Sequence, residues 1–238
     1  MSTWPTAVIV GAGPGLGLAL ARRFAREGFA LALVARHQQT LASVAAALGG
    51  LGPRLRTYAA DAGDAAAVAG VCAAVARDLG EPSVLIYNAG SYRPGGIADV
   101  TPEEFEAAWK TGCLGAFLFA RALLPAMADA GRGSVLLTGA TAAWRGGRGF
   151  ATLAVPKFGL RALAQSMARE YGPQGVHVAH VVIDGQIDTP RLREREPDRP
   201  AHTLLAPDAI AETYWQLHCQ DPSAWTLELD LRPAVERF

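Results

Sequence analysis

A glycine-rich turn near the start of the chain constrains the fold more than any other stretch. The apolar run Ala7–Val10 is typical of a buried parallel strand, and from Leu16 onward the spacing of apolar and charged residues indicates a helix. Glycines let the backbone adopt positive φ and approach a pyrophosphate, and a helix N-terminus presents free N–H groups. This order predicts a dinucleotide site rather than a tight turn without a ligand. The residues predicted to form it are Gly11, Gly13, Gly15, Leu16 and Gly17.

Apolar segments and helical patterns alternate along the rest of the chain. The predicted strands are Ala7–Val10, Ala30–Ala35, Arg54–Ala59, Val84–Asn88, Ser134–Thr138, His177–Ile183 and Trp225–Leu231. The predicted helices are Leu16–Gly28, Gln38–Leu48, Asp64–Leu79, Pro102–Thr111, Gly115–Ala130, Pro156–Tyr171 and Pro207–Gln220. The alternation predicts a single doubly wound α/β domain of the Rossmann type over residues 1–238. Its seven-stranded, mostly parallel sheet should carry helices on both faces.

Length and composition agree with one globular domain and exclude several functions. The 238 residues are 50% hydrophobic and 18% charged, which allows a large core and argues against disorder. With 22 basic and 22 acidic residues, the formal net charge is +0, so nothing attracts nucleic acid or an anionic membrane electrostatically. No apolar run approaches the roughly 18 residues that span a bilayer, so we expect no membrane segment.

The cysteines and the N-terminus predict a cytoplasmic protein. Cys72, Cys113 and Cys219 form no CxxC pair, so we expect them to be buried thiols in a reducing compartment. The chain enters its first strand almost directly, without the basic segment and cleavage site of a signal peptide. We expect no metal site.

Arg36 at the end of the second predicted strand indicates which dinucleotide would bind. In doubly wound folds, the residue about 20 positions after the glycine turn meets the adenosine ribose, and an acid there selects against a 2′-phosphate. Here that position falls at Ala35–His37, where no acid is present and Arg36 offers a guanidinium suited to phosphate, with His37 beside it. NADP(H) is therefore favoured over NAD(H). An ordinary surface charge is the alternative.

One irregular region, residues 187–203, follows the sixth predicted strand and is crowded with arginine and glutamate. Because it starts at the carboxyl end of a strand, we interpret it as a lid over the site rather than as a solvated loop.

The chain resembles the short-chain dehydrogenases/reductases over residues 8–230. Its turn matches the family's TGxxxGxG pattern through Gly11, Gly15 and Gly17, with Val10 in place of threonine. The resemblance implies a Rossmann-type fold, a nicotinamide dinucleotide cofactor and hydride transfer to or from a carbonyl or alcohol carbon.

Three further stretches gain binding roles by this resemblance. Asp61 lies where the family places an aspartate against the adenine ring. Tyr87–Gly90 matches the NNAG stretch, and Asp184–Thr189 resembles PGxxxT, whose later residues address the nicotinamide carboxamide. A plain turn-forming role is the alternative for Asp61 and for the asparagine. The binding residues implied are Asp61, Asn88, Ala89, Gly90, Ile187 and Thr189.

Most of the family's proton-transfer residues are missing. The family's YxxxK motif retains only its lysine, Lys157, and Leu153 stands at the tyrosine position. The serine position holds Ala140, and the asparagine position holds Gly112. By the resemblance, Lys157 still binds the nicotinamide ribose, whereas a solvated helix lysine is the alternative.

Two other side chains are candidates to replace the missing acid. Tyr92 is the nearby phenol, and Asp184 is a carboxyl whose pKa partial desolvation can raise into a useful range. Thr141 and Thr152 adjoin the serine and tyrosine positions, but aliphatic hydroxyls are poor acids. A one-residue step on a helix also turns a side chain by about 100°. The predicted catalytic residues are thus Lys157, Tyr92 and Asp184, although a loop role without chemistry is the alternative for Tyr92 and Asp184.

Three functions remain open from the sequence. The first is an NADP(H)-dependent oxidoreductase that acts on a small hydrophobic carbonyl compound or alcohol with a rearranged acid. The second is a non-catalytic NADP(H)-binding sensor or regulatory protein, and the third is an inactive subunit that stabilises a catalytic relative. By family analogy, helices Gly115–Ala130 and Pro156–Tyr171 would pair across the axis of a homodimer or homotetramer. Their expected contact faces carry Ala120, Ala126, Ala162, Ala164 and Ala168.

Overall fold

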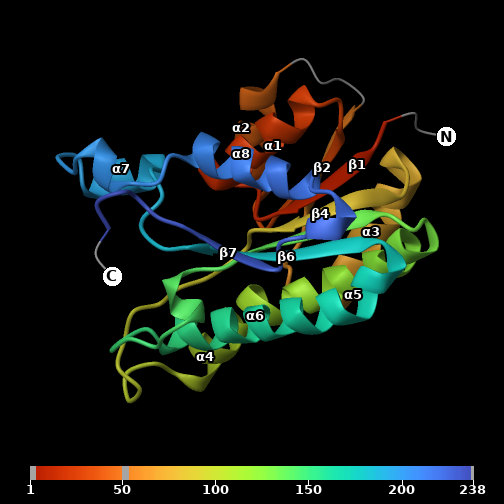
Figure 1. The fold of residues 1–238 in the computed structure, drawn as a ribbon. Helices are drawn as coiled ribbons and strands as arrows, with labels where there is room; N and C mark the ends of the chain where they lie inside the picture. Colours follow the sequence, from red (N-terminus) through yellow and green to blue (C-terminus); the bar gives the residue numbers. More distant parts are fainter. Residues whose placement is uncertain (1–3, 50–53, 237–238) are drawn as a thin grey trace.

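A seven-stranded sheet runs through the computed structural model, which describes residues 4–49 and 54–236 (Figure 1). The strands lie in the order β3-β2-β1-β4-β5-β6-β7, and every pairing is parallel. The chain therefore adds strands in one direction from β1 to β3 and in the other direction from β4 to β7. In open α/β sheets, ligands bind at the carboxyl ends of the strands at this reversal point, here between β1 and β4. The strands are β1 (Thr6–Val10), β2 (Ala30–Ala35), β3 (Leu55–Ala59), β4 (Pro82–Tyr87), β5 (Gly133–Thr138), β6 (Val176–Ile183) and β7 (Glu228–Leu231).

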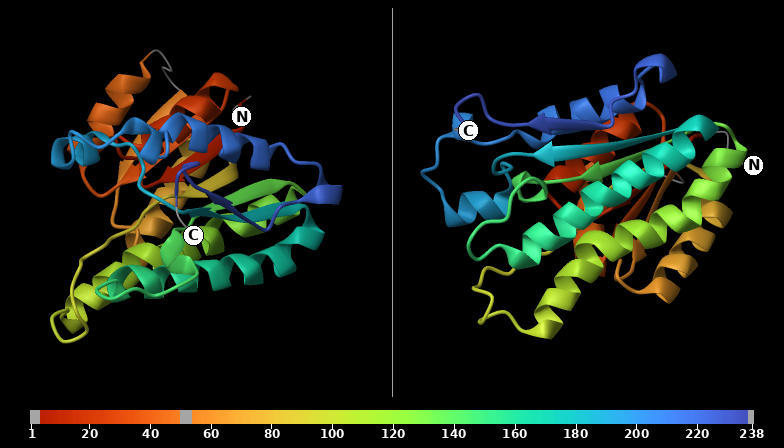
Figure 2. Two further views of the ribbon diagram at one scale, coloured as in Figure 1. Left: turned by 60° about the vertical axis from the view of Figure 1, so that its left-hand side comes forward. Right: turned by 60° about the horizontal axis from the view of Figure 1, so that its bottom comes forward.

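Helices cover both faces of the sheet, as predicted for a doubly wound fold (Figure 1). One face carries α1, α2 and α8, and the other carries α3, α5 and α6, with α5 beside α6 (Figure 2). The helices are α1 (Leu16–Arg26), α2 (Gln38–Leu48), α3 (Ala65–Leu79), α4 (Pro102–Trp109), α5 (Gly115–Asp129), α6 (Ala151–Tyr171), α7 (Pro190–Arg195) and α8 (Pro207–His218).

The central strand β1 is buried on both faces, which explains its continuous apolar sequence. Because side chains alternate along a strand, Val8 and Val10 join the cluster under α3, α5 and α6. Ala7 and Ile9 join the cluster under α1, α2 and α8. The carboxyl end of β1 is thus held rigidly where the glycine turn begins.

One continuous helix replaces two predicted ones. The π-helical segment Lys110–Leu114 joins α4 to α5, where the sequence suggests a break. The hydroxyl of Tyr87 lies in this widened turn and donates a hydrogen bond of 2.5 Å to the Thr111 carbonyl. A Cβ on Gly115 would lie 2.2 Å from the same hydroxyl, so this glycine makes room for the phenol instead of ending the helix.

The merged helix Pro102–Asp129 corrects the expectation that no segment is long and apolar enough to cross a membrane. It passes that test by length and composition, with a mean hydropathy of 1.5 over its most apolar window. Half of that window is buried within the fold, as in a core helix. The sequence pattern did not reveal this length because it suggested two separate helices.

Several predicted boundaries move. Strand β4 begins two residues earlier than predicted, β7 begins at Glu228 instead of Trp225, and α6 begins at Ala151 instead of Pro156. The cysteines are free, but only Cys72 is buried, whereas Cys219 is exposed.

Candidate functional site

The glycine turn is packed so closely that side chains would not fit at two of its positions. Gly11 has a φ of +86°, and a Cβ on it would lie 2.6 Å from the Ala89 amide nitrogen. A Cβ on Gly17 would lie 2.6 Å from the Gly11 carbonyl oxygen. A Cβ on Gly13 would meet no atom within 4 Å, so this glycine borders open space. The turn is therefore a backbone cradle of the kind that phosphate groups occupy.

The end of β4 supports this cradle from behind. Asn88 donates from Nδ2 to the Gly11 carbonyl at 3.1 Å and from its backbone to the Val10 carbonyl at 2.8 Å. The side chain of Leu16 is buried in the core, so only its backbone is available at the start of α1. Gly15, the residue before that helix, has no capping side chain.

A cavity of about 240 Å³ opens beside the turn at the reversal point of the sheet. The predicted residues Gly11, Gly13, Arg36 and Asn88–Gly90 line it together. Thr40, Ala60, Ala62 and Thr111 also line it and were not singled out from the sequence. Among the described lining residues there is no carboxylate.

Asp61 lies at the rim of the cavity, between two of its lining residues. Its Oδ1 accepts a hydrogen bond of 2.8 Å from the Gly63 amide, and its carbonyl accepts one from Asp64. The turn-forming role is therefore present in the structure. The residue is exposed, so its side chain is accessible from the cavity side.

Lys157 lies at the other end of the site, on α6. Its Nζ donates a hydrogen bond of 2.5 Å to the Thr138 carbonyl, and burial lowers the pKa of the amine to about 8. A Cβ on Gly90 would lie 3.7 Å from this nitrogen. The lysine is 6% exposed and is therefore not the solvated helix residue of the alternative interpretation.

The other three positions singled out for proton transfer hold apolar groups. Leu153 lies one helical turn before it on α6 and is half-buried, as is Ala140 after β5. Gly112 is buried in the π-helical segment, and a Cβ on it would lie 2.7 Å from the Pro156 Cβ. These side chains offer no group that exchanges a proton.

The two neighbouring threonines have different partners. Thr152 is fully buried, and its hydroxyl bonds the backbone of Arg93. Thr141 donates a hydrogen bond of 2.6 Å to Asp184 Oδ1. Asp184 is also buried, and its Oδ2 lies 3.4 Å from Nη1 of Arg232, a residue that sequence reasoning missed.

Tyr92 lies further out than the other candidate acid. It is 42% exposed and its ring stacks on Phe150 with centroids 4.9 Å apart. Its hydroxyl lies 3.5 Å from the Gly149 carbonyl.

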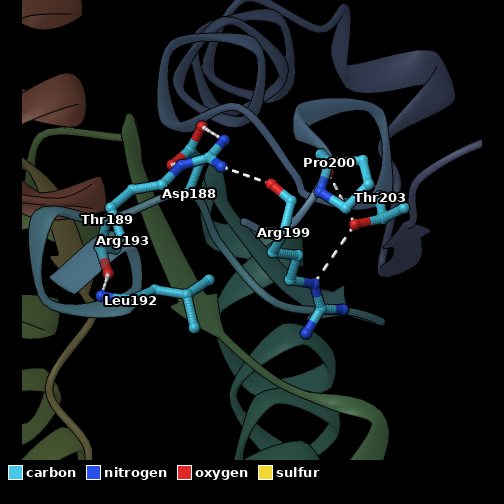
Figure 3. Close-up of polar contacts among 7 residues, drawn as sticks. All are labelled: Asp188, Thr189, Leu192, Arg193, Arg199, Pro200 and Thr203. Atoms are coloured by element: carbon cyan, nitrogen blue, oxygen red, sulfur yellow. Dashed lines mark hydrogen bonds and ion pairs between the residues drawn. The ribbon is translucent and has the colours of Figure 1, made fainter. Parts of the chain in front are cut away.

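The region interpreted as a lid is folded and contains α7 (Figure 3). Arg193 donates two hydrogen bonds of 2.7 Å to the Asp188 carboxylate and a third to the Arg199 carbonyl. Ile187 pairs with Leu205 in an isolated bridge, which holds the start of the segment. The charged residues of this region therefore stabilise it internally.

Thr189 connects this segment to the glycine turn. Its hydroxyl accepts a hydrogen bond of 3.3 Å from the Leu192 amide and so caps α7. A Cβ on Gly15 would lie 2.6 Å from the Thr189 methyl carbon, so the two residues are in close contact. The segment therefore touches the turn at this residue.

Known proteins share this architecture. The family model for short chain dehydrogenases matches residues 5–200. An oxidoreductase of Sarocladium schorii, asL5, is 30% identical over 192 residues, which are 81% of this chain and 76% of the relative. A solved short-chain dehydrogenase from Rhodopseudomonas palustris is 36% identical, with a TM-score of 0.82 over 96% of this chain and 98% of that one.

A second solved structure contains a cofactor analogue. An alcohol dehydrogenase from Thermococcus sibiricus, complexed with 5-hydroxy-NADP, is 28% identical, with a TM-score of 0.86 over 98% of each chain. The family model and the relatives match most of this chain in sequence, and the solved structures match its fold. The chain therefore belongs to the short-chain dehydrogenase family.

Proposed function

We propose that the protein binds NADP(H) in preference to NAD(H). Arg36 carries this proposal, because it lines the cavity at the end of β2 together with His37 and Thr40. His37 precedes α2 without capping it, so the free N–H groups of the first helical turn face the same region as the guanidinium. A 2′-phosphate would meet positive charge there, and no carboxylate of the described lining would repel it.

The residues around the cavity assign the remaining parts of the cofactor. The backbone of the glycine turn would hold the pyrophosphate, Asp61 the adenine, and Asn88–Gly90 with Lys157 the nicotinamide ribose. Ile187 and Thr189 would meet the carboxamide. The bound cofactor supplies or accepts the hydride.

We further propose that the protein is an oxidoreductase for a small hydrophobic carbonyl compound or alcohol, with Thr141 and Asp184 as its proton route. The observation behind this is the 2.6 Å hydrogen bond between them beside Ala140. In alcohol oxidation, the substrate hydroxyl proton passes to Thr141 Oγ1 while the threonine proton passes to Asp184. Carbonyl reduction reverses both transfers and consumes one proton. Tyr92 is the weaker candidate, because its hydroxyl lies near Gly149 on the exposed side.

A second function, nucleotide binding without turnover, is favoured by the apolar surroundings of Lys157. Leu153 and Pro156 occupy the first turns of α6 ahead of the lysine and offer no group that exchanges a proton. A protein with this site would retain the cofactor and act as a sensor, or as a supporting subunit for an active relative.

We also propose a homodimer that forms through α4, α5 and α6. The predicted alanine faces support this only in part, because Ala120 and Ala164 are buried in the core. The exposed surface of these helices instead carries large apolar side chains, which are Phe105, Trp109, Phe117, Val155 and Phe158. Such a surface favours association with a second copy. A cytoplasmic location is likewise a proposal.

The cofactor proposal is tested by calorimetric titration of NADPH and NADH. We expect NADPH to bind the wild type more tightly, and Arg36→Ala to weaken NADPH about tenfold or more while leaving NADH unchanged. Arg132→Ala is the matched control, because Arg132 lies just before β5, at the amino ends of the strands and away from the cavity. Equal affinities of the two nucleotides in the wild type would disprove the preference.

The reaction is tested by following NADPH oxidation with a panel of hydrophobic aldehydes and ketones. Turnover that Thr141→Val and Asp184→Asn both reduce at least a hundredfold, with NADPH affinity retained, supports the proton route. Loss of turnover in Tyr92→Phe instead would transfer that role to Tyr92. Tight NADPH binding without turnover on any compound would favour the second function.

A further inference from the structure

Two segments on the open side of the site are joined into one rigid unit, which we call the clasp (residues 91–96 and 149–152). The fully buried Thr152 donates from Oγ1 to the Arg93 carbonyl at 2.6 Å and accepts from the Arg93 amide at 3.2 Å. The Gly95 amide donates to the Gly149 carbonyl at 3.2 Å. The loop after β4 is thereby fixed to the start of α6.

The clasp carries a pair of stacked aromatic rings. Tyr92 and Phe150 have ring centroids 4.9 Å apart and an interplanar angle of 20°. They nevertheless remain 42% and 40% exposed. Large apolar side chains that are ordered and exposed together commonly mark a binding surface. The pair is therefore an ordered, exposed aromatic stack on whose outer ring face another ring could stack.

Both residues of this aromatic pair are linked to positions of the proposed site, and the Phe150 carbonyl accepts a hydrogen bond of 2.9 Å from the Leu153 amide. Tyr92 is two residues beyond Gly90, which packs near Lys157, and Phe150 is the residue before α6, one turn ahead of Leu153. Trp144, which is 37% exposed, lies in the same connection between β5 and α6. A substrate between Leu153 and the clasp would thus meet aromatic surface on its outer side.

Resting on the proposed oxidoreductase function, we propose that the substrate is a planar aromatic carbonyl compound that stacks on the Tyr92–Phe150 pair. Offset stacking attracts one aromatic ring to another beyond simple burial of area, whereas a puckered aliphatic ring gains only the area. The hydrogen bonds of the clasp fix the backbone that carries the two rings, and the rings stack on each other before the ligand arrives, so little side-chain entropy is lost on binding. The stacking surface therefore selects for flat substrates.

The test compares two ketones of similar size, 2-acetylnaphthalene and its saturated analogue 2-acetyldecalin. Each is titrated by calorimetry into the protein saturated with NADP⁺, which cannot reduce a ketone. We expect the flat ketone to bind about three- to tenfold more tightly in the wild type. Phe150→Leu and Tyr92→Leu should remove most of this preference. Tyr92→Phe should keep it, because the ring remains.

A control variant and two readouts separate the possible outcomes. Trp4→Leu removes an equally exposed aromatic residue at the amino ends of the strands. It should leave the preference for the flat ketone unchanged. NADPH affinity shows whether each variant has kept its fold. A stacking preference without any turnover would leave the aromatic site standing and refute the oxidoreductase function.

Two results would overturn the stacking proposal itself. One is equal affinity of the two ketones in the wild type, or a preference that survives Phe150→Leu. The other is a change of oligomeric mass in Phe150→Leu without any effect on ketone binding, which would show that a second copy covers these rings.

Discussion

The ring of Pro156 in α6 occupies the space that any side chain at Gly112 would need. A Cβ on Gly112 would lie 2.7 Å from the Pro156 Cβ and 3.3 Å from its Cγ. Because the backbone fixes the position of a Cβ, the two positions are coupled across the contact between α6 and the π-helical segment. An asparagine at 112 does not fit while residue 156 carries a Cβ.

This coupling predicts the behaviour of a double mutant. Gly112→Asn alone should lower the free energy of unfolding by about 1–3 kcal/mol through overpacking. The same change in a Pro156→Gly background should cost much less, because glycine removes the Cβ that lies 2.7 Å away and the helix regains an N–H donor. Urea unfolding of all four proteins measures the interaction, and additive effects would refute it. Rebuilding the family's proton-transfer residues therefore requires Pro156→Gly besides Ala140→Ser, Leu153→Tyr and Gly112→Asn.

Lys157 should make the stability depend on pH in the alkaline range. Burial lowers its pKa in the folded protein to about 8 from an ordinary value of 10.5. Between these values the unfolded chain binds more protons, so stability should rise with pH. Lys157→Met should flatten this rise and increase the free energy of unfolding at pH 7 by roughly 1–3 kcal/mol. Urea unfolding at pH 7 and 9.5 measures both effects, and the same slope in both proteins would contradict the prediction.

His180 and His177 should respond oppositely to the same substitution. In the described part of the chain neither ring nitrogen of His180 has a partner, whereas His177 contacts the Leu217 and Thr226 carbonyls. His180→Leu should therefore raise the free energy of unfolding by about 1–3 kcal/mol, and His177→Leu should lower it.

The pH profile provides a second readout for His180. Burial first, and then the charge of Lys157, lowers its pKa to about 4. Because the unfolded chain binds the proton more readily, stability should fall as the pH drops from 6.5 towards 4. His180→Leu should remove part of that decline. If His180→Leu instead lowers the free energy of unfolding as much as His177→Leu does, the His180 ring nitrogens are not unsatisfied in the folded protein.

Glu228 should contribute stability that acid removes. Hydrogen bonds from Arg161 and Gln165 lower its pKa to about 2 from 4.5. Its contribution should be complete above pH 4.5 and disappear as the pH falls towards 2. Glu228→Gln should cost about 1 kcal/mol at pH 7 and flatten the profile between pH 5 and 3. Thermal unfolding across this range measures the effect, with the exposed Glu170→Gln as control.

Much of the fold could be predicted because the central strands are short, apolar and flanked by polar turns. Strand β2 and helix α2 have the predicted bounds at both ends. The start of α6 was missed because Pro156 resembles a first helical residue, whereas the helix begins after Phe150, which provides no polar cap. The junction of α4 and α5 was missed because Gly115 resembles a breaker, although it serves to accommodate the Tyr87 hydroxyl.

The site was predictable where its residues follow one another along the chain. The glycine turn and Arg36 depend on local patterns at the ends of β1 and β2, and the structure brings both to one cavity. The partners of Asp184 were not predictable, because Arg232 comes from a different strand end far along the sequence. The unpaired nitrogens of His180 likewise result from packing that no local pattern encodes.

The contact between Thr189 and Gly15 also joins two parts of the chain that lie far apart in the sequence. The same threonine packs its methyl group against the glycine turn and caps α7 with its hydroxyl. A movement of Thr189 away from the turn would therefore leave α7 without its cap. The ion pair between Arg193 and Asp188 holds the same segment from its other side, so the glycine turn and residues 187–205 are mechanically linked.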